Sequence, residues 1–520
     1  MRLSILILGS LLAVPGFSAT SCADLAAQSL PHTTIKTAER ITAGSFPVPG
    51  QQNTIPNLPP FCRVAGTIRP SADSDIQFEV WLPDEASWNT RYLGTGNGGF
   101  AGDINYRGIG SAIQRGYASA STDTGHTGTN GISAAWANGH PEKLIDYGHR
   151  AIHETTVVAK ALVKAFYQKK LEHSYFSSCS NGGRQALMEA QRYPDDFDGI
   201  IAGAPANNFT HIASEFVWIA QALTAAYIPS AKMPALEAAT LSACDAKDGV
   251  KDGVLDDPRQ CKFDPAVLLC KGAESDACLT QGQIDTLRKI YEGPKDSRGH
   301  EILAGFEPGG ETGPGGWGGW ITGGSLTKSA QFGFGSEIYA QMVYVNKDWD
   351  YKTFDLTRDT KLADQKIGHV INATDANLKS FVKHGGKLIL YHGWCDPALP
   401  PRNTIEYYEA VRAKMGPKQA DAFMRLYMLP GVQHCGGGPG PNHYGDFDKE
   451  PDATSNLLLA LERWVESGVA PADLTAVRYK GNRAAAGVER SRPICAYPQV
   501  AKYKGSGSTD EAASFECKVP

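Results

Sequence analysis

Short apolar runs alternate with longer helical patterns along most of the chain. An apolar run of roughly four to eight residues bounded by turn residues is typical of a strand, and apolar positions three and four apart are typical of a helix. Strand, helix and strand in succession indicate a parallel sheet, so the predicted fold class is α/β. The predicted strands are 63–68, 76–82, 91–93, 117–121, a run from Tyr175, 199–204, 387–391 and 425–429. The predicted helices are 147–167, 184–193, 209–227 and 457–466.

This pattern is interrupted in the middle of the chain. At 520 residues the chain is too long for one simple core, so we expect one large domain with an insertion, or two domains. The pattern changes at about residue 208, and the strand pattern returns at residue 387. Within this stretch, residues 295–330 are rich in glycine, tryptophan and proline. Such loops can line an aromatic-binding cleft, and equally often they cover the surface, packed by their own tryptophans. Residues 24–60 are predicted to be loop-rich.

The N-terminus is typical of an exported protein. Arg2 precedes an apolar run over residues 3–14, and small residues follow at Ser18 and Ala19. This run is too short to span a bilayer and fits a cleaved signal peptide, predicted over residues 1–19. We therefore expect a secreted or periplasmic protein. The net charge of −5 gives no attraction to nucleic acid or to an anionic membrane, so neither is an expected partner.

The 11 cysteines agree with an oxidising compartment. Local spacing suggests three disulfides, and a fourth would tie down the mature N-terminus. These pairs are Cys244–Cys261, Cys270–Cys278, Cys495–Cys517 and Cys22–Cys62. Cys179, Cys395 and Cys435 remain, and one of them must be unpaired.

One short stretch has the residues of a strand-to-helix turn that could present a nucleophile. In α/β-hydrolases a serine sits at the tip of such a turn, and its flanks must be small. Here the G-x-S-x-G pattern is Ser178-x-Ser180-x-Gly182, so serine replaces the first glycine. On their own, these residues fit a glycine-serine surface turn equally well.

Three other loops after predicted strands carry residues that such chemistry needs. Residues 94–100 are rich in glycine; an α/β-hydrolase takes one oxyanion-hole amide from a loop at this place, although the loop alone also fits a flexible turn. Asp396 and His434 lie in loops after two later strands. Ser180, Asp396 and His434 therefore occur in the triad order of α/β-hydrolases. Ester hydrolysis needs a hydroxyl nucleophile, a base and a carboxylate that orients the base.

Cysteines stand beside two of these residues. Cys179 precedes Ser180, and Cys435 follows His434. If the serine and the histidine are hydrogen-bonded, the Cα atoms of the two cysteines can lie within disulfide range, roughly 4.4–6.8 Å. A Cys179–Cys435 bridge would then fix nucleophile and base, and would leave Cys395 free. We interpret Cys395 as a small loop residue rather than a nucleophile.

An acidic loop with two glycines lies between Cys244 and Cys261. It contains the carboxylates of Asp245, Asp248 and Asp252. Calcium takes six to eight oxygen ligands from carboxylates and backbone carbonyls, but the final glutamate of an EF-hand is missing here. Spacing alone fits a calcium loop and an acidic surface turn equally, and the flanking cysteines favour a clamped loop.

Two histidines, His149 and His153, lie four residues apart on a predicted helix. No third ligand and no H-E-x-x-H pattern accompanies them in the sequence. We therefore interpret both as ordinary helix residues rather than metal ligands.

Together these motifs resemble the tannase and feruloyl esterase family of α/β-hydrolases, over nearly the whole mature chain. The Cys-Ser…Asp…His-Cys constellation is highly specific, whereas Ser178 departs from the glycine that the family usually has. The matching segments are Pro-Pro-Phe-Cys-Arg-Val at 59–64, the loop 94–100, Cys-Ser-Asn-Gly-Gly-Arg-Gln at 179–185, Gly393-Trp394-x-Asp396 and His434-Cys435-Gly436.

The resemblance implies an α/β-hydrolase core in residues 20–207 and 375–520, with a large inserted lid over 208–374. It implies Ser180 as nucleophile, His434 as base, Asp396 as its orienting carboxylate and a Cys179–Cys435 bridge. It also implies oxyanion-hole amides at Asn181 and Gly98, and a place for His392 in the wall of the substrate pocket.

The resemblance further implies a structural calcium ion in the lid. Its ligands would be the side chains of Asp245, Asp248 and Asp252 and the carbonyl groups of Val250 and Val254.

The function implied is a secreted serine esterase acting on small esters of aromatic acids, whose alcohol can belong to plant cell-wall polysaccharide. Feruloyl and other hydroxycinnamoyl esters are the first choice, gallate esters the second and terephthalate monoesters the third. A hydrolase-shaped binding protein without catalysis is the alternative from another class. Such proteins typically lose a triad member, whereas all three residues are present here.

Overall fold

The computed structural model describes residues 20–42, 44–128, 131–445 and 454–520. The predicted signal peptide, residues 1–19, lies outside the described residues. Of the helices in the described part, none is long and apolar enough to cross a membrane.

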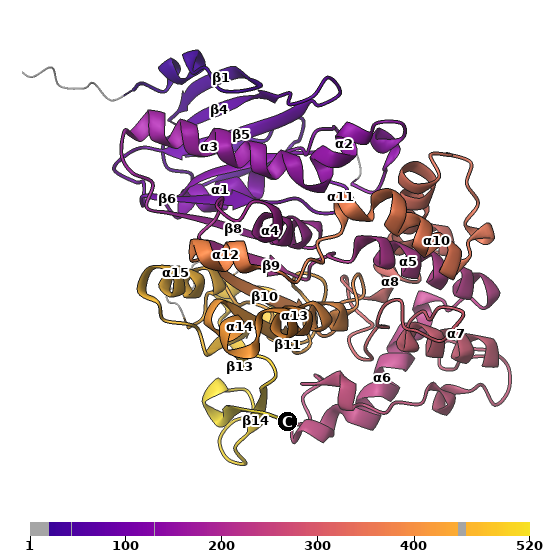
Figure 1. The fold of residues 1–520 in the computed structure, drawn as a ribbon. Coiled ribbons are helices and arrows are strands. Elements are labelled where there is room, and N and C mark those ends of the chain that lie inside the picture. The colour runs from indigo at the N-terminus through magenta and orange to yellow at the C-terminus, as the bar shows by residue number, and fades with distance from the viewer. Residues whose placement is uncertain (1–19, 43, 129–130, 446–453) are drawn as a thin grey trace, which may run out of the picture.

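A nine-stranded sheet forms the centre of the molecule (Figure 1). Its strand order is β1-β4-β5-β7-β6-β8-β9-β10-β11. The strands from β7 to β11 in this order pair in parallel, and β1, β4, β5 and β7 pair antiparallel at one edge. The bounds are β1 Thr33–Ile41, β4 Phe61–Ile68, β5 Ile76–Pro83, β6 Arg91–Thr95, β7 Ala118–Thr122, β8 His173–Cys179, β9 Gly199–Gly203, β10 Lys387–Gly393 and β11 Met424–Leu429.

Helices cover both faces of this sheet, because successive residues of a strand point to opposite sides. Phe176 of β8 packs in one core with Leu162 of α3 and Leu187 of α4. Its neighbour Tyr175 packs in a second core with Leu461 of α15. The helices of these layers are α1 Tyr106–Gln114, α2 Pro141–Ile145, α3 Ala151–Tyr167, α4 Asn181–Arg192, α12 Lys379–His384, α13 Pro401–Met415, α14 Pro417–Phe423 and α15 Leu457–Ser467.

The chain between β9 and β10 contributes no strand to the sheet and forms most of the right-hand part of the molecule in Figure 1. It has an apolar core of its own around Leu236 and Ile284, and it shares a second core with residues that precede β8. Its helices are α5 Phe209–Ala225, α6 Met233–Cys244, α7 Gln281–Glu292, α8 Trp317–Trp320, α9 Ala330–Glu337, α10 Leu356–Ala363 and α11 His369–Ile371.

The strands missed from the sequence lie at the edges of the molecule. Residues 24–60, predicted to be loop-rich, contain β1, which pairs with β4 at the sheet edge. Six of its nine residues are threonine, lysine, glutamate or arginine, and none is fully buried, so it lacks the apolar signal of the inner strands. The remaining strands form three small hairpins: β2 Ser45–Pro47 with β3 Thr54–Pro56, β12 Asp473–Tyr479 with β13 Val488–Cys495, and β14 Val500–Tyr503 with β15 Phe515–Lys518.

The structure contains the five disulfides predicted from the sequence. They are Cys22–Cys62, Cys179–Cys435, Cys244–Cys261, Cys270–Cys278 and Cys495–Cys517. Cys395 is free, as predicted.

Candidate active site

Ser180 occupies the tight turn between β8 and α4. Its backbone has φ 68° and ψ −126°, which is strained for a residue with a side chain. The turn also needs glycine after the serine. A Cβ atom at Gly182 would lie 1.9 Å from the Ser178 side-chain oxygen, and one at Gly183 would lie 2.3 Å from the Gly203 carbonyl oxygen. The turn therefore has the geometry of a nucleophile elbow even though Ser178 replaces the usual glycine.

A chain of hydrogen bonds joins the three residues expected to form a triad. The Ser180 hydroxyl lies 2.9 Å from His434 Nε2, and His434 Nδ1 lies 2.8 Å from Asp396 Oδ2. Since Nδ1 faces a carboxylate, it carries the proton, and Nε2 is free to accept the serine proton. Residues that are more than 200 positions apart in the sequence are thus placed for proton transfer.

Asp396 is held as an anion although it is buried. Its Oδ1 accepts hydrogen bonds from the amides of Ala398 and Leu399, at 2.7 and 3.0 Å. Burial opposes its ionisation, but the charge of His434 and hydrogen bonds from His392 and His434 outweigh burial and hold the pKa of Asp396 well below its ordinary value.

His392 lies elsewhere than the resemblance implied. Its ring is completely buried and does not line the pocket that contains Ser180. Its Nε2 donates to Asp396 Oδ2 at 3.0 Å, and its Nδ1 accepts from the Thr404 hydroxyl at 2.7 Å. The physical reason is that His392 lies within β10, where its side chain points toward Thr404 of α13. It is therefore a positioning residue for Asp396 rather than a contact for substrate.

The Cys179–Cys435 disulfide links the residue before Ser180 to the residue after His434, with the two Cα atoms 5.9 Å apart. It therefore couples the nucleophile turn to the loop that carries the base. Cys395 lies beside Asp396, and burial raises the pKa of its thiol far above its usual value. A thiol that stays protonated is a poor nucleophile, which agrees with a bystander role for Cys395.

Two loops offer backbone amides beside Ser180. Asn181 opens α4, and amides in the first turn of a helix have no acceptor within the helix. The glycine-rich loop is fixed against the same helix, because Gln185 Oε1 accepts the Asn97 amide at 3.0 Å. Gly99 lines the pocket with Ser180 and Asn181, whereas Gly98 lines a separate cavity behind the loop. The oxyanion role of Gly98 stays a prediction, and Gly99 joins it as a candidate.

An apolar pocket opens at Ser180. Its wall comes from the core and from the insertion, and Trp320 meets the His434 ring edge to face with centroids 4.9 Å apart. Among the described residues of this lining, the polar groups are the side chains of Ser180, Asn181 and His434 and the indole N–H of Trp320. The apolar members are Phe100, Ala206, Phe209, Ile212, Phe216, Trp320, Phe334, Ile338, Ala398 and Leu399. Of these, the sequence pointed only to the tryptophan-rich segment, because the path of the insertion over the site depends on long-range packing.

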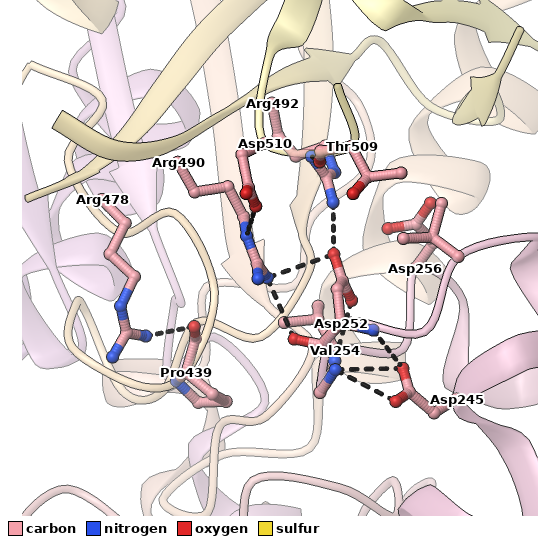
Figure 2. A network of polar contacts seen from close by, with 12 residues as sticks. Asp245, Asp252, Val254, Asp256, Pro439, Arg478, Arg490, Arg492, Thr509 and Asp510 are labelled. Atoms are coloured by element: carbon pink, nitrogen blue, oxygen red, sulfur yellow. Dashed lines mark hydrogen bonds and ion pairs between the residues drawn. The ribbon is translucent and has the colours of Figure 1, made fainter. Parts of the chain in front are cut away.

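The acidic loop between Cys244 and Cys261 folds around its own amides (Figure 2). Asp245 accepts hydrogen bonds from the amides of Asp252 and Gly253 at 3.1 Å. Asp248 accepts from the amides of Val250 and Asp256 at 2.9 and 3.3 Å. The predicted aspartates are thus ordered within one compact loop.

Residues that the sequence analysis missed complete this loop. Burial and the neighbouring Asp248 raise the pKa of Asp256 to about 8, and burial raises the pKa of Asp248 itself to about 6. Arg490 and Arg492 of β13 pair with the Asp252 carboxylate, as Figure 2 shows. The β12–β13 hairpin therefore holds the acidic loop in place, although more than 200 residues separate them in the chain.

Comparison with known proteins agrees with this geometry. A sequence model of the family described as tannase and feruloyl esterase matches residues 62–518. An uncharacterized esterase of Xanthomonas campestris is 45% identical, over 98% of this chain and 93% of that protein. A protein of Aspergillus terreus named "Probable feruloyl esterase B-2" is 34% identical, over 88% of this chain and 86% of its own. The crystal structure of feruloyl esterase B from Aspergillus oryzae superposes with a TM-score of 0.87 at 29% identity, covering 96% of this chain and 99% of that one.

Proposed function

Because this chain belongs to the tannase and feruloyl esterase family of carboxylic ester hydrolases, we propose that it cleaves hydroxycinnamoyl esters with Ser180 as the nucleophile. Its fold is that of the α/β-hydrolases, and its relatives support an ester of an aromatic acid as the substrate. The observation that carries the proposal is the hydrogen-bonded chain from Ser180 through His434 to Asp396. The Ser180 end of this chain faces the apolar pocket.

In the proposed acylation, His434 Nε2 accepts the Ser180 proton as the serine oxygen attacks the ester carbonyl. Asp396 stays ionised, keeps the proton on Nδ1 and stabilises the imidazolium that forms. The protonated His434 then donates to the departing alcohol. Water, activated by the same histidine, attacks the acyl-enzyme and releases the aromatic acid.

The negative charge on the reacting carbonyl oxygen would rest on backbone amides. The Asn181 amide is one proposed donor, and the amide of Gly98 or Gly99 is the other. Donors fixed in a site from which water is excluded stabilise the transition state without having to reorient, and one such hydrogen bond is worth about 100- to 1000-fold in kcat.

The chemistry of the pocket favours a hydroxycinnamoyl group over the alternatives. A galloyl group would bury three hydroxyls among phenylalanine, leucine and isoleucine side chains, and each unsatisfied hydroxyl costs about 1–3 kcal/mol. A terephthalate monoester would bring a carboxylate, and the described residues that line this pocket include no lysine or arginine. A feruloyl group has a long apolar body and a single hydroxyl.

We therefore expect the mature protein to hydrolyse methyl ferulate with a kcat/KM at least about 30-fold above that for methyl gallate, since two extra unsatisfied hydroxyls cost 2 kcal/mol or more. Activity on mono(2-hydroxyethyl) terephthalate should be lower still. Initial rates on the three esters, with Ser180→Ala as the blank, measure this directly. A preference for gallate would make the protein a tannase. Activity on none of them would leave an untested ester or the binding-protein alternative.

We also propose that the acidic loop holds a structural calcium ion. The donor set is oxygen only, as calcium prefers, and buried carboxylates with raised pKa values would gain from a cation. Asp245, Asp248 and Asp252, with the carbonyls of Val250 and Val254, would hold it. Asp252 would bind the ion through Oδ1, because its Oδ2 pairs with Arg490 and Arg492. The ion would stabilise the insertion that covers the pocket and would take no part in the chemistry.

Removal of calcium should therefore lower Tm by about 2–3 °C, because an ion present at about 100 times its Kd adds roughly 2.7 kcal/mol to stability, and a chain of this length has an unfolding entropy of about 1 kcal/mol/K. Addition of calcium alone to the chelated protein should restore Tm. Asp245→Asn should melt at the temperature of the chelated wild type, and added calcium should not raise its Tm. In Asp276→Asn, which replaces an exposed aspartate outside the loop, added calcium should raise Tm as in the wild type. Equal melting curves with and without calcium in the wild-type protein would contradict the site.

A further inference from the structure

A second polar cluster lies where α3, α4 and the loop before β9 meet. It consists of His153 on α3, Glu189 on α4 and Asp196 in the loop between α4 and β9. One possible ligand atom from each residue lies within 4.8 Å of the other two. Across the described residues, the acidic loop included, no other three histidine, cysteine or acidic side chains come together this closely.

Glu189 contributes a buried carboxylate to this cluster. The residue is 1% exposed, and within the described part of the chain neither of its carboxylate oxygens has a hydrogen-bond partner. Among the charged groups around it, the largest effect comes from another carboxylate, Asp196, which cannot donate a hydrogen bond when ionised. A buried carboxylate without a donor costs several kcal/mol unless a cation or a proton neutralises it.

The positive groups around the cluster do not reach Glu189 with a hydrogen bond. The ammonium group of Lys160 donates a hydrogen bond to the backbone carbonyl oxygen of Asp196. His153 Nδ1 lies 2.6 Å from Asp196 Oδ2, and its ring stacks on Tyr193 with centroids 3.9 Å apart. The side chain of His153 is 29% exposed, so the cluster has a route to solvent on this side.

We propose that His153, Glu189 and Asp196 form a binding site for a divalent transition-metal cation of the zinc type. One imidazole nitrogen and two carboxylates are ligands that Zn²⁺ takes at about 2.0–2.2 Å, with a fourth position left for water. At these bond lengths tetrahedral ligand atoms are about 3.4 Å apart. His153 Nδ1 and Asp196 Oδ2 would then separate slightly, and Glu189 would move toward them. Calcium and magnesium are disfavoured because they prefer all-oxygen sites.

The place of the cluster in the fold indicates a structural role. Glu189 lies nine residues beyond Ser180 on α4, about 13 Å along the helix axis. The cation would join the end of this helix to α3 and to the loop that leads into β9. It would therefore anchor the helix that carries the nucleophile at its N-terminus, without touching substrate.

The test is zinc binding by the untagged mature protein, stripped with chelator and then saturated with calcium so that the acidic loop is filled. We expect one molar equivalent of Zn²⁺ by titration calorimetry. We also expect an anomalous peak at the zinc edge between His153, Glu189 and Asp196 in crystals of the wild type. The peak does not depend on whether any variant folds.

Two variants and one control make the assignment specific. Loss of an outer-shell partner alone weakens metal binding about 10- to 100-fold, so loss of a ligand in Glu189→Gln or His153→Gln should weaken it at least about 100-fold. His140→Gln, which removes a histidine paired with Asp73 at 3.0 Å on the surface, should bind zinc like the wild type. Zinc uptake unchanged in both ligand variants would overturn the proposal. So would the absence of uptake by the wild type, which would mean that Glu189 and Asp196 share a proton instead.

Discussion

Replacement of Ser180 by alanine is expected to lower kcat on an aromatic ester by at least about 10,000-fold while the protein stays folded. Among the described residues, the Ser180 hydroxyl is the only group that both hydrogen-bonds to His434 Nε2 and lines the apolar pocket. Without it no acyl-enzyme can form, and only the oxyanion amides and substrate binding remain to accelerate attack by water. The backbone strain at position 180 is the same for serine and alanine, so we expect little change in Tm.

Steady-state rates and thermal melting by circular dichroism measure both parts of this prediction. Ser178→Ala is the matched control, since it removes a hydroxyl two residues earlier in the same turn. That variant should keep its activity within about tenfold, because Ser178 contacts Gly182 rather than His434. Turnover retained by Ser180→Ala would mean that the nucleophile lies elsewhere.

Asp396→Asn should lower kcat by about 10,000-fold, because an amide cannot replace the carboxylate in this environment. Four N–H groups face the two carboxylate oxygens. The amides of Ala398 and Leu399 face Oδ1, and His392 and His434 face Oδ2. If the asparagine oxygen takes the place of Oδ1 and accepts the two backbone amides, its NH₂ group takes the place of Oδ2. That NH₂ group then faces two ring N–H donors. His434 must then change tautomer, which places a proton on the nitrogen that should accept from serine.

The pH dependence provides a second readout for the same residue. The pKa of Asp396 in the folded protein is well below its ordinary value, so the carboxylate is ionised at every pH above about 4. The stability that it contributes is complete above its unfolded pKa and is lost only as pH falls toward the lowered folded pKa. Any loss of wild-type activity between pH 5 and 8 should therefore not come from Asp396.

Asp364→Asn is the control for this variant, because Asp364 also pairs with a histidine, His211, at 3.1 Å but outside the site. It should retain wild-type kcat within about threefold. Asp396→Asn with kcat within tenfold of the wild type would exclude Asp396 as the residue that orients the base.

The parts of the molecule that sequence predicts well are those in which local chemistry and local structure coincide. The strand before Ser180, the turn and the helix after it were all visible, since Gly182 and Gly183 must be small for this turn to close. The helix itself begins at Asn181, three residues before its predicted start at residue 184, because the two glycines belong to its first turn. The disulfides followed from spacing and from the neighbours of Ser180 and His434.

The features that the sequence analysis missed depend on contacts between distant segments. His392 was placed in the pocket wall, but its position within β10 turns it toward Asp396. Arg492 reaches Asp252 from 240 residues away. His153 had no recognisable partner in its own helix, whereas the fold brings Glu189 and Asp196 beside it. Local sequence patterns do not predict these contacts, because they depend on the tertiary packing of distant segments.

Covalent labelling of the nucleophile tests the central claim most directly. The mature protein is treated with an aryl phosphonate ester, which forms a stable adduct with an activated serine, and its peptides are mapped by mass spectrometry. We predict a single adduct on Ser180 that appears as esterase activity disappears, and no adduct in Asp396→Asn over the same time. An adduct on another residue would contradict the proposed triad. Complete loss of esterase activity without modification of Ser180 would also contradict it.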